Sequence, residues 1–225
     1  MYTLFVTGGI GSGKSAFVGR LKELGATVYD LDAISHEVLE DDDTVRALVR
    51  AFGPEILEEG SCPVPDSLDE EFVSDSNDIL PLGRISRPAL AWRAFSSPEA
   101  TDLLNSIVHP RVFTRLAQHL ASGCSCCASS HDVVNVVEVQ LIDKAGESLA
   151  LADEVLGILC PRDMRRSNAQ ARGMDPSDFD RRDALQITDE QRASYCTSTL
   201  VNDKGLEHLR EMADDWWHRH CPTRP

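Results

Sequence analysis

The sequence reads Gly8-Gly9-Ile10-Gly11-Ser12-Gly13-Lys14-Ser15 (GGIGSGKS) close to its start, and this stretch has the spacing of a phosphate-binding P-loop. Such a match carries structural meaning only between a strand and a helix. The preceding run Tyr2–Thr7 is short, β-branched and aromatic, which is typical of a buried strand. After Lys14, apolar residues recur at helical spacing as far as Leu24. The sequence therefore predicts a strand, a phosphate cradle and a helix in that order.

The residue types of the cradle fit a bound phosphate. Glycines let the backbone turn tightly with its N–H groups pointing inward, and the amino terminus of a helix favours negative charge. In P-loops the lysine, here Lys14, reaches the terminal phosphates, and the serine hydroxyl, here Ser15, ligates Mg²⁺. A glycine-rich turn without a ligand is the alternative, and the position at the end of the first strand disfavours it.

Further apolar runs predict a sheet. Ala26–Tyr29, Val133–Val139, Val155–Cys160 and Ser198–Val201 are short and rich in β-branched residues, and helical patterns separate them. Alternation of this kind predicts an α/β fold with a parallel sheet of about five strands flanked by helices, and the P-loop motif makes this a fold of the P-loop NTPase type. Residues from about 84 to 120 read as helices and predict a small helical subdomain. Residues 61–82 are acidic with little periodicity, which favours an exposed loop.

The overall composition excludes several classes of protein. Asp and Glu number 37 against 22 Lys and Arg, and the net charge of -15 argues against a nucleic-acid partner, which needs a basic footprint. No apolar run approaches the ~18 residues of a membrane-spanning helix, and the start lacks the basic region of a signal peptide. Seven scattered cysteines favour reduced thiols and a cytoplasmic protein. The cluster at residues 124–127 lacks a second Cys/His pair and is interpreted as a loop of thiols rather than a metal site.

Three carboxylates are expected near the phosphates. Asp30 and Asp32 follow the second predicted strand, and ligands of open parallel sheets gather at the carboxyl ends of the strands. One carboxylate would orient an attacking hydroxyl and the other a metal-bound water, or Asp30 would simply cap the next helix. Glu138, near the end of the third predicted strand, is a candidate acid to support Mg²⁺ through water.

An arginine-rich segment follows the fourth predicted strand, over about residues 162–186. Guanidinium groups match phosphate oxygens, so one interpretation is a mobile lid over the nucleotide. The other is a solvated pair of helices whose arginines pair with neighbouring aspartates. The arginines are Arg162, Arg165, Arg166, Arg172, Arg181 and Arg182.

Taken in chain order, several motifs resemble the dephospho-coenzyme A kinase family. They are TGGIGSGKS at 7–15, LGATVYDLDAISHEV at 24–38, Gly83-Arg84-Ile85-Ser86-Arg87, His109-Pro110, Arg172-Gly173-Met174, Gln186 and Val201-Asn202-Asp203-Lys204-Gly205. The resemblance runs from residue 1 to about residue 217. Its most specific part is the P-loop variant joined to a strand that ends in Asp-x-Asp.

The resemblance implies transfer of the γ-phosphoryl group of ATP, with Mg²⁺, to the ribose 3′-hydroxyl of dephospho-coenzyme A, the last step of coenzyme A synthesis. It implies one P-loop kinase domain over residues 1–225. Within it lie a nucleotide-binding core of about 1–40 and 131–217, an acceptor-binding helical subdomain of about 84–120, the acidic insertion 61–82 and a lid of about 162–186.

The family's functional residues carry over by position. The catalytic set is Lys14, Asp32 and Arg172, with Asp32 as base or orienting residue for the hydroxyl and Ser15 as metal ligand. The ATP contacts are Gly9, Ile10, Gly11, Ser12, Gly13, Lys14, Ser15, Ala16 and Asn202, of which Asn202 would lie by the adenine. The acceptor contacts are Asp30, Asp32, Arg87, His109 and Glu138.

The chain departs from the family pattern at three positions. Gln140 replaces a proline, Lys144 replaces an acid, and Asn168 replaces an arginine four residues before Arg172. Arg165 and Arg166 are candidates to supply the missing charge. Two other functions stay open from sequence: a P-loop kinase for another nucleoside or nucleotide, and a nucleotide-hydrolysing switch protein, which would release its diphosphate without an acceptor.

Overall fold

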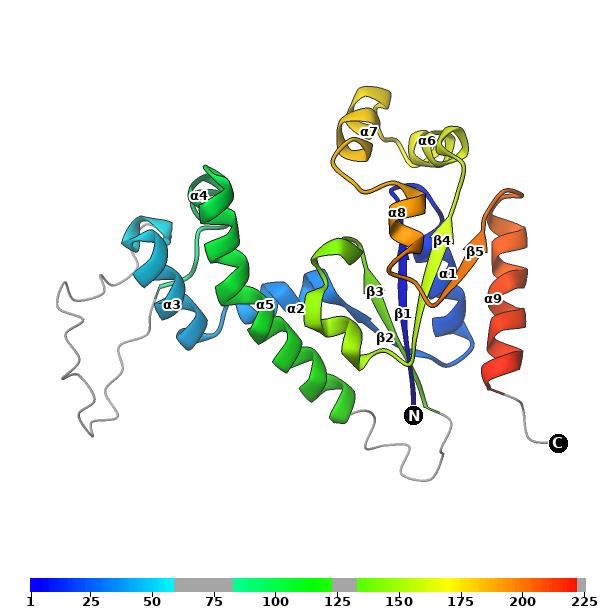
Figure 1. Ribbon diagram of the computed structural model, residues 1–225, viewed down its shortest axis with the longest axis horizontal. Helices are drawn as coiled ribbons and strands as arrows, with labels where there is room; N and C mark the ends of the chain where they lie inside the picture. The colour runs from blue at the N-terminus through cyan, green and yellow to red at the C-terminus, as the bar shows by residue number, and fades with distance from the viewer. Residues whose placement is uncertain (59–82, 123–132, 222–225) are drawn as a thin grey trace. The chain divides into compact units, whose positions relative to one another are not determined.

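The computed structural model describes residues 1–58, 83–122 and 133–221, so the predicted acidic loop at 61–82 and the cysteine cluster at 124–127 lie outside the described residues. The chain forms two compact units, which Figure 1 colours by residue number. The first unit comprises residues 1–32 and 117–225, and the second comprises residues 33–116. The second unit therefore begins well before the predicted subdomain of about 84–120.

A parallel five-stranded sheet forms the centre of the first unit, as predicted. The strands are β1 (Tyr2–Gly8), β2 (Thr27–Asp30), β3 (Val134–Val139), β4 (Glu154–Leu159) and β5 (Ser198–Val201), in the spatial order β2-β3-β1-β4-β5. All pairs are parallel, so the carboxyl ends of the strands share one edge. The central strand β1 is buried from Thr3 to Gly8, which suits its mainly apolar and β-branched sequence.

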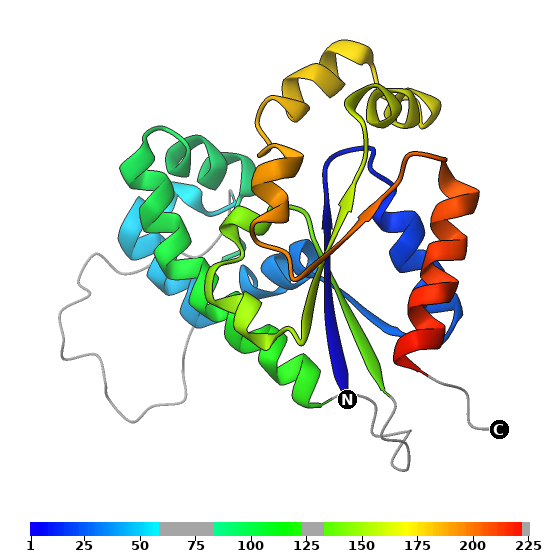
Figure 2. The same cartoon turned by 45° about the vertical axis from the view of Figure 1, so that its right-hand side comes forward.

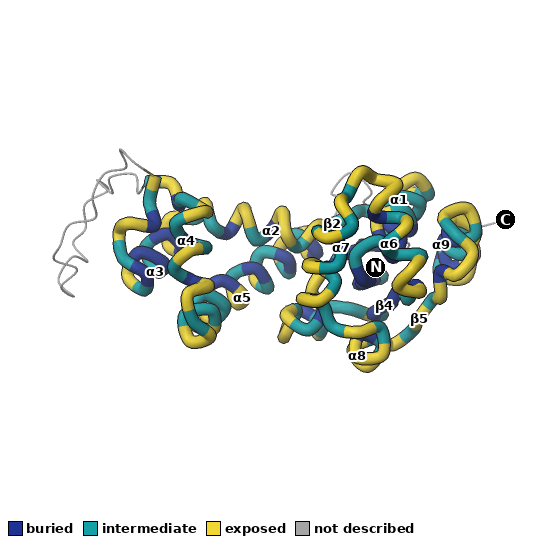
Figure 3. Tube along the Cα trace, turned by 90° about the horizontal axis from the view of Figure 1, so that it is seen from above, coloured by how far each residue is buried: buried dark blue, intermediate teal, exposed yellow. Residues whose placement is uncertain are grey.

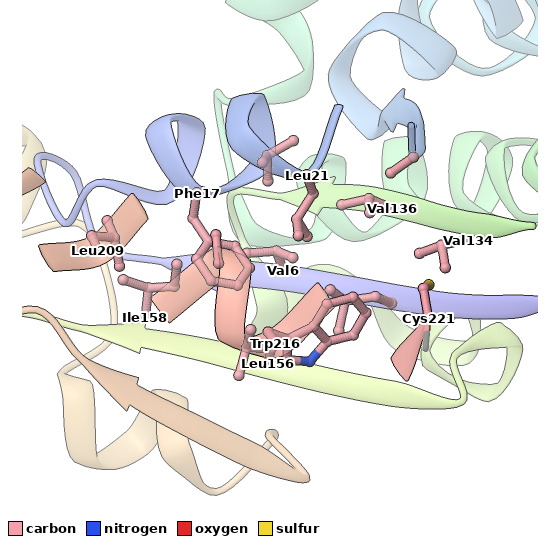
Figure 4. Close-up of a cluster of buried hydrophobic side chains, with 14 residues drawn as sticks. Val6, Phe17, Leu21, Val134, Val136, Leu156, Ile158, Leu209, Trp216 and Cys221 are labelled. Carbon is pink, nitrogen blue, oxygen red and sulfur yellow. The ribbon is translucent and has the colours of Figure 1, made fainter. Parts of the chain in front are cut away.

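Two helices cover one face of this sheet. Helix α1 (Lys14–Glu23) and helix α9 (Leu206–His220) contribute Phe17, Leu21 and Trp216 to a core with Val6 and Leu156 (Figure 4). Figure 3 shows that α9 buries one side and exposes the other, as its amphipathic pattern requires. Helix α1 ends before Gly25, whose φ of 114° belongs to the left-handed region, as the sequence predicts for a helix stop.

Short helices connect strands β3, β4 and β5. Two 3₁₀ helices, η2 (Ile142–Lys144) and η3 (Gly146–Leu151), link β3 to β4. Helices α6 (Arg162–Ala171) and α7 (Pro176–Asp183) lie past the carboxyl end of β4 (Figure 2), in the segment predicted to be a lid. Asp175 caps α7 by accepting from the N–H of Ser177, and α8 (Asp189–Ala193) then leads to β5.

The second unit is helical. It contains most of α2 (Leu31–Val38), then α3 (Asp42–Phe52), the 3₁₀ helix η1 (Pro54–Ile56), α4 (Arg87–Ala94) and the greater part of α5 (Pro98–Ala121). Leu48, Ile56, Leu90 and Ala94 are among its buried side chains. Among the described residues, no helix is both long and apolar enough to cross a membrane.

Candidate active site

The P-loop backbone has a conformation that only glycine tolerates at two positions. Gly11 has φ 77° and Gly13 has φ 97°, both in the left-handed region. A Cβ atom on Gly11 would lie 2.1 Å from the carbonyl oxygen of Arg165, so the loop also passes too close to α6 for any side chain. A hydrogen bond from Ser12 N to Gly9 O, 3.0 Å, closes the turn before α1 begins. The glycines thus fix the cradle that their spacing predicts.

Three polar side chains from distant parts of the chain hold this loop. Asn202 Nδ2 donates to Ser12 O at 2.8 Å, and Asn168 Nδ2 donates to Gly11 O at 2.9 Å. Gln186 Oε1 accepts from Ile10 N at 2.9 Å. Asn202 is fully buried, so in this structure its amide nitrogen supports the loop, while its predicted position by the adenine stays a prediction.

Lys14 and Ser15 meet the same carboxylate. Glu138 Oε1 accepts a hydrogen bond from Ser15 Oγ at 3.0 Å and forms an ion pair with Lys14 Nζ. The strand register places Glu138 opposite Val6 of β1 and Asp30 of β2, which the sequence pattern did not specify. The Lys14 side chain is 10% exposed and that of Glu138 is 19% exposed, so their charges interact with little screening by water.

Asp30 and Asp32 have different partners. Asp30 Oδ1 accepts from Asp32 N at 2.9 Å, the capping role that the sequence left open for Asp30. Asp32 Oδ2 accepts from Gln140 Nε2 at 2.6 Å. The Asp32 carboxylate therefore contacts the segment that follows β3. This segment lies at the same edge of the sheet as the P-loop.

A pocket of about 430 Å³ lies beside the P-loop, and neither Asp30 nor Asp32 is among the residues that line it. It is lined by residues Gly8 to Ser15, Glu138, Gln140, Leu141, Arg172, Arg182, Leu185 and Gln186. An adjoining pocket of about 400 Å³ shares Ile10, Gly11 and Arg172 with it and continues along α6 to Asp178. Arg172 thus lines both pockets and Arg182 lines the 430 Å³ pocket, while the predicted catalytic role of Arg172 stays a prediction.

Most other arginines of this segment are paired with aspartates. Arg162 and Arg165 both contact Asp183, and Arg166 donates to Asp180 at 3.0 Å. Burial acts to raise the pKa of Asp183, but hydrogen bonds from Arg165 and Arg162 outweigh it and lower that pKa. Arg165 and Arg166, the candidates to replace the arginine absent at position 168, are thus engaged with carboxylates and do not line the 430 Å³ pocket.

A buried arginine below the P-loop escaped the sequence analysis. Arg192 is 1% exposed, donates to Thr7 Oγ1 at 3.2 Å and lies 3.7 Å from Asp189. Burial lowers the pKa of its guanidinium. Its contact with Thr7 braces the residue that precedes the first glycine of the loop. Nothing in the local sequence distinguishes it from an exposed helical arginine.

Comparison with known proteins decides the family. A family model described as dephospho-CoA kinase matches residues 2–74 and 62–208. This chain belongs to the dephospho-CoA kinase family. It is therefore an enzyme, a phosphotransferase of coenzyme A biosynthesis, and the two other functions left open by the sequence are not favoured.

Individual relatives agree over nearly the whole chain. The dephospho-CoA kinase of Corynebacterium jeikeium is 34% identical, over 96% of this chain and 98% of its own length. That of Leifsonia xyli is 31% identical, over 96% and 98%. Among solved structures, the protein TT1252 from Thermus thermophilus has a TM-score of 0.69 at 25% identity, covering 97% of each chain. A dephospho-CoA kinase from Campylobacter jejuni shares the fold, with a TM-score of 0.55 at 19% identity over 96% of each chain.

Two residues that the dephospho-CoA kinase resemblance assigns to the acceptor lie in the second unit. Arg87 is the first residue of α4 and lines a pocket of about 780 Å³ together with His36, Glu58 and Arg84. His109 is an exposed residue of α5. Their contact with the acceptor remains a prediction from the resemblance.

Proposed function

We propose that this kinase transfers the γ-phosphoryl group of ATP to the ribose 3′-hydroxyl of dephospho-coenzyme A, with the P-loop edge of the sheet as its catalytic centre. The observation that carries the proposal is the convergence of Lys14, Ser15 and Glu138 at one pocket, with Asp32 attached to its rim through Gln140. In-line phosphoryl transfer asks the protein for positioning and charge stabilisation, and these groups provide both.

The site fits a divalent cation. Ser15 Oγ and Glu138 Oε1 lie 3.0 Å apart and offer the oxygen ligands that Mg²⁺ prefers. Bound there, Mg²⁺ neutralises negative charge on the phosphates. Ser15 would hold it directly and Glu138 through water, which leaves Lys14 to exchange its carboxylate partner for the terminal phosphates.

Asp32 is proposed to act on the acceptor. Its carboxylate accepts the proton of the 3′-hydroxyl while the hydroxyl oxygen forms its bond to the γ-phosphorus and the bond to the ADP oxygen breaks. Asp30 is proposed to contribute mainly through the helix cap that fixes the main chain at Asp32. Arg172, which lines both pockets beside the P-loop, is proposed to bind the phosphoryl group in transfer.

The substrates and location follow as proposals. ATP and dephospho-coenzyme A are the small-molecule partners, and the excess of acidic residues supports the absence of a nucleic-acid partner. Cytoplasmic location is expected from the cysteine usage of the sequence.

The position of phosphorylation provides the test. Purified enzyme is incubated with MgATP and either dephospho-coenzyme A or its 3′-deoxy analogue, and the products are analysed by mass spectrometry. We expect one added phosphate on the natural acceptor and none on the analogue. Phosphorylation of the analogue, or no product from either, would contradict the proposal.

A further inference from the structure

The hydrogen bond between Gln140 and Asp32 joins the predicted base to the phosphate pocket. Gln140 lies just past β3 and lines the pocket with Gly13 and Lys14. Its Nε2 atom donates to Asp32 Oδ2 at 2.6 Å, a short distance of the kind seen when the acceptor carries a charge.

Strand register brings the two side chains together. Asp30 pairs with Glu138 across the parallel strands β2 and β3. Asp32 and Gln140 each come two residues after that pair, so they leave the sheet at the same place. The contact therefore follows from the sheet and not from a chance meeting of surface loops.

The hydrogen bond between Gln140 and Asp32 contributes little to the stability of the folded protein. Both side chains are exposed, and hydrogen bonds between exposed groups compete with water. The family pattern that the sequence resembles has proline at position 140, and proline has no side-chain donor. The glutamine amide therefore gives this chain a side-chain hydrogen-bond donor to Asp32 that a proline at position 140 would not provide.

We propose that Gln140 is a positioning residue for Asp32. By donating to Oδ2, its amide fixes the rotation of the Asp32 carboxylate, so that the carboxylate meets the acceptor hydroxyl in one orientation. Gln140 itself takes no proton and need not touch the acceptor. This inference rests on the proposed role of Asp32.

A double-mutant cycle tests the inference. Gln140→Met removes the donor with little change of size, and Asp32→Asn removes the carboxylate. We expect Gln140→Met to lower kcat about 10-fold, the scale of a mispositioned catalytic group, while the KM values for ATP and dephospho-coenzyme A stay within about 2-fold. In the Asp32→Asn background, the same substitution should lower kcat no further.

Controls separate positioning from folding. Gln118→Met makes the same change at an exposed glutamine of α5 and should match the wild type in kcat and Tm. Gln140→Met should also keep the wild-type Tm and ATP affinity.

Three results would overturn the inference. An equal fold-loss from Gln140→Met with and without Asp32 would show that Gln140 acts independently of it. A rise confined to the KM for dephospho-coenzyme A would make Gln140 a substrate contact. Wild-type kcat in Asp32→Asn would instead remove the proposed role of Asp32 itself, a failure that the single variant reveals.

Discussion

At the scale of the residue, the site depends on a few polar side-chain contacts between distant parts of the chain. Glu138 receives both Lys14 and Ser15, Asp32 receives Gln140, and Asn202 supports Ser12. The bonds to the Glu138 and Asp32 carboxylates are charged and therefore stronger than neutral ones, and with the neutral bond from Asn202 they hold the loop and its acids in place before the nucleotide arrives.

Gly11 provides the clearest test of the cradle at this scale. Gly11→Ala should lower stability by more than the ~1–2 kcal/mol of left-handed strain, because its Cβ would also overlap the Arg165 carbonyl oxygen. Gly173→Ala is the matched control, since Gly173 has φ 86° but no heavy atom within 4 Å of an added Cβ. Urea unfolding and ATP binding by calorimetry measure both. If the two variants lost equal stability and kept equal ATP affinity, the claim that α6 lies too close to Gly11 for a side chain would be contradicted.

At the scale of the element, Arg172 at the end of α6 and Arg182 in α7 both belong to the wall of the 430 Å³ pocket. Arg172 and Arg182 line it, whereas Arg162, Arg165 and Arg166 are tied to Asp180 and Asp183. Arg182 also pairs with Asp178 at 2.9 Å. Pairing of arginines with aspartates is therefore observed for this segment, and Arg182 both lines the pocket and binds an aspartate, whereas its action as a lid stays a prediction.

Arg182→Ala should lower kcat/KM for ATP about 10- to 100-fold, because it removes a cation beside the phosphates. Arg181→Ala is the matched control. Arg181 directly precedes Arg182 in the sequence and also pairs with Asp178, but it does not line the pocket. Steady-state kinetics at varied ATP compare the two. Equal losses in both variants would mean that only the pairing with Asp178 matters.

Asp183 should make the segment sensitive to acid. Its pKa is lowered in the folded protein, so its ion pairs stabilise at a pH above the ordinary carboxyl value of about 4 and are lost as the pH falls through the folded value. Asp183→Asn should therefore lower Tm at pH 7, and its Tm should approach that of the wild type as the pH falls below the ordinary carboxyl value of about 4. Thermal melts over this range measure the difference. If the difference between the two Tm values did not shrink as the pH fell, the stabilising role of the Asp183 ion pairs would be contradicted.

The sequence was enough to predict the strands, but not the side-chain contacts between distant parts of the chain. All five strands were predicted to within a residue or two, because each is a short run rich in β-branched or apolar residues between helical patterns. The contacts of Asn168 and Gln186 with the P-loop, and of Arg192 with Thr7 just before it, were not predicted. They join residues more than 150 positions apart, and one-dimensional patterns contain no information on which side chains meet across a sheet.

At the scale of the whole molecule, nucleotide binding should stabilise the chain. A ligand at 100 times its Kd contributes about 2.7 kcal/mol, and for a chain of this size each kcal/mol raises Tm by about 2–4 °C. MgATP should therefore raise the wild-type Tm by several degrees. Lys14→Ala, which lacks the cation for the terminal phosphates, should show a much smaller rise in the same melts. An undiminished rise in this variant would mean that Lys14 does not bind the nucleotide.

The account as a whole makes phosphoryl transfer depend on both substrates and on Asp32. The most direct measurement is ADP release at saturating MgATP, with and without dephospho-coenzyme A, for the wild type and Asp32→Asn. We predict that the acceptor raises ADP release by the wild type at least 100-fold, the scale of general base catalysis with a positioned hydroxyl, and that Asp32→Asn loses most of this rise while keeping its ATP affinity. ADP release that is the same without the acceptor, or an Asp32→Asn enzyme as fast as the wild type, would contradict the account.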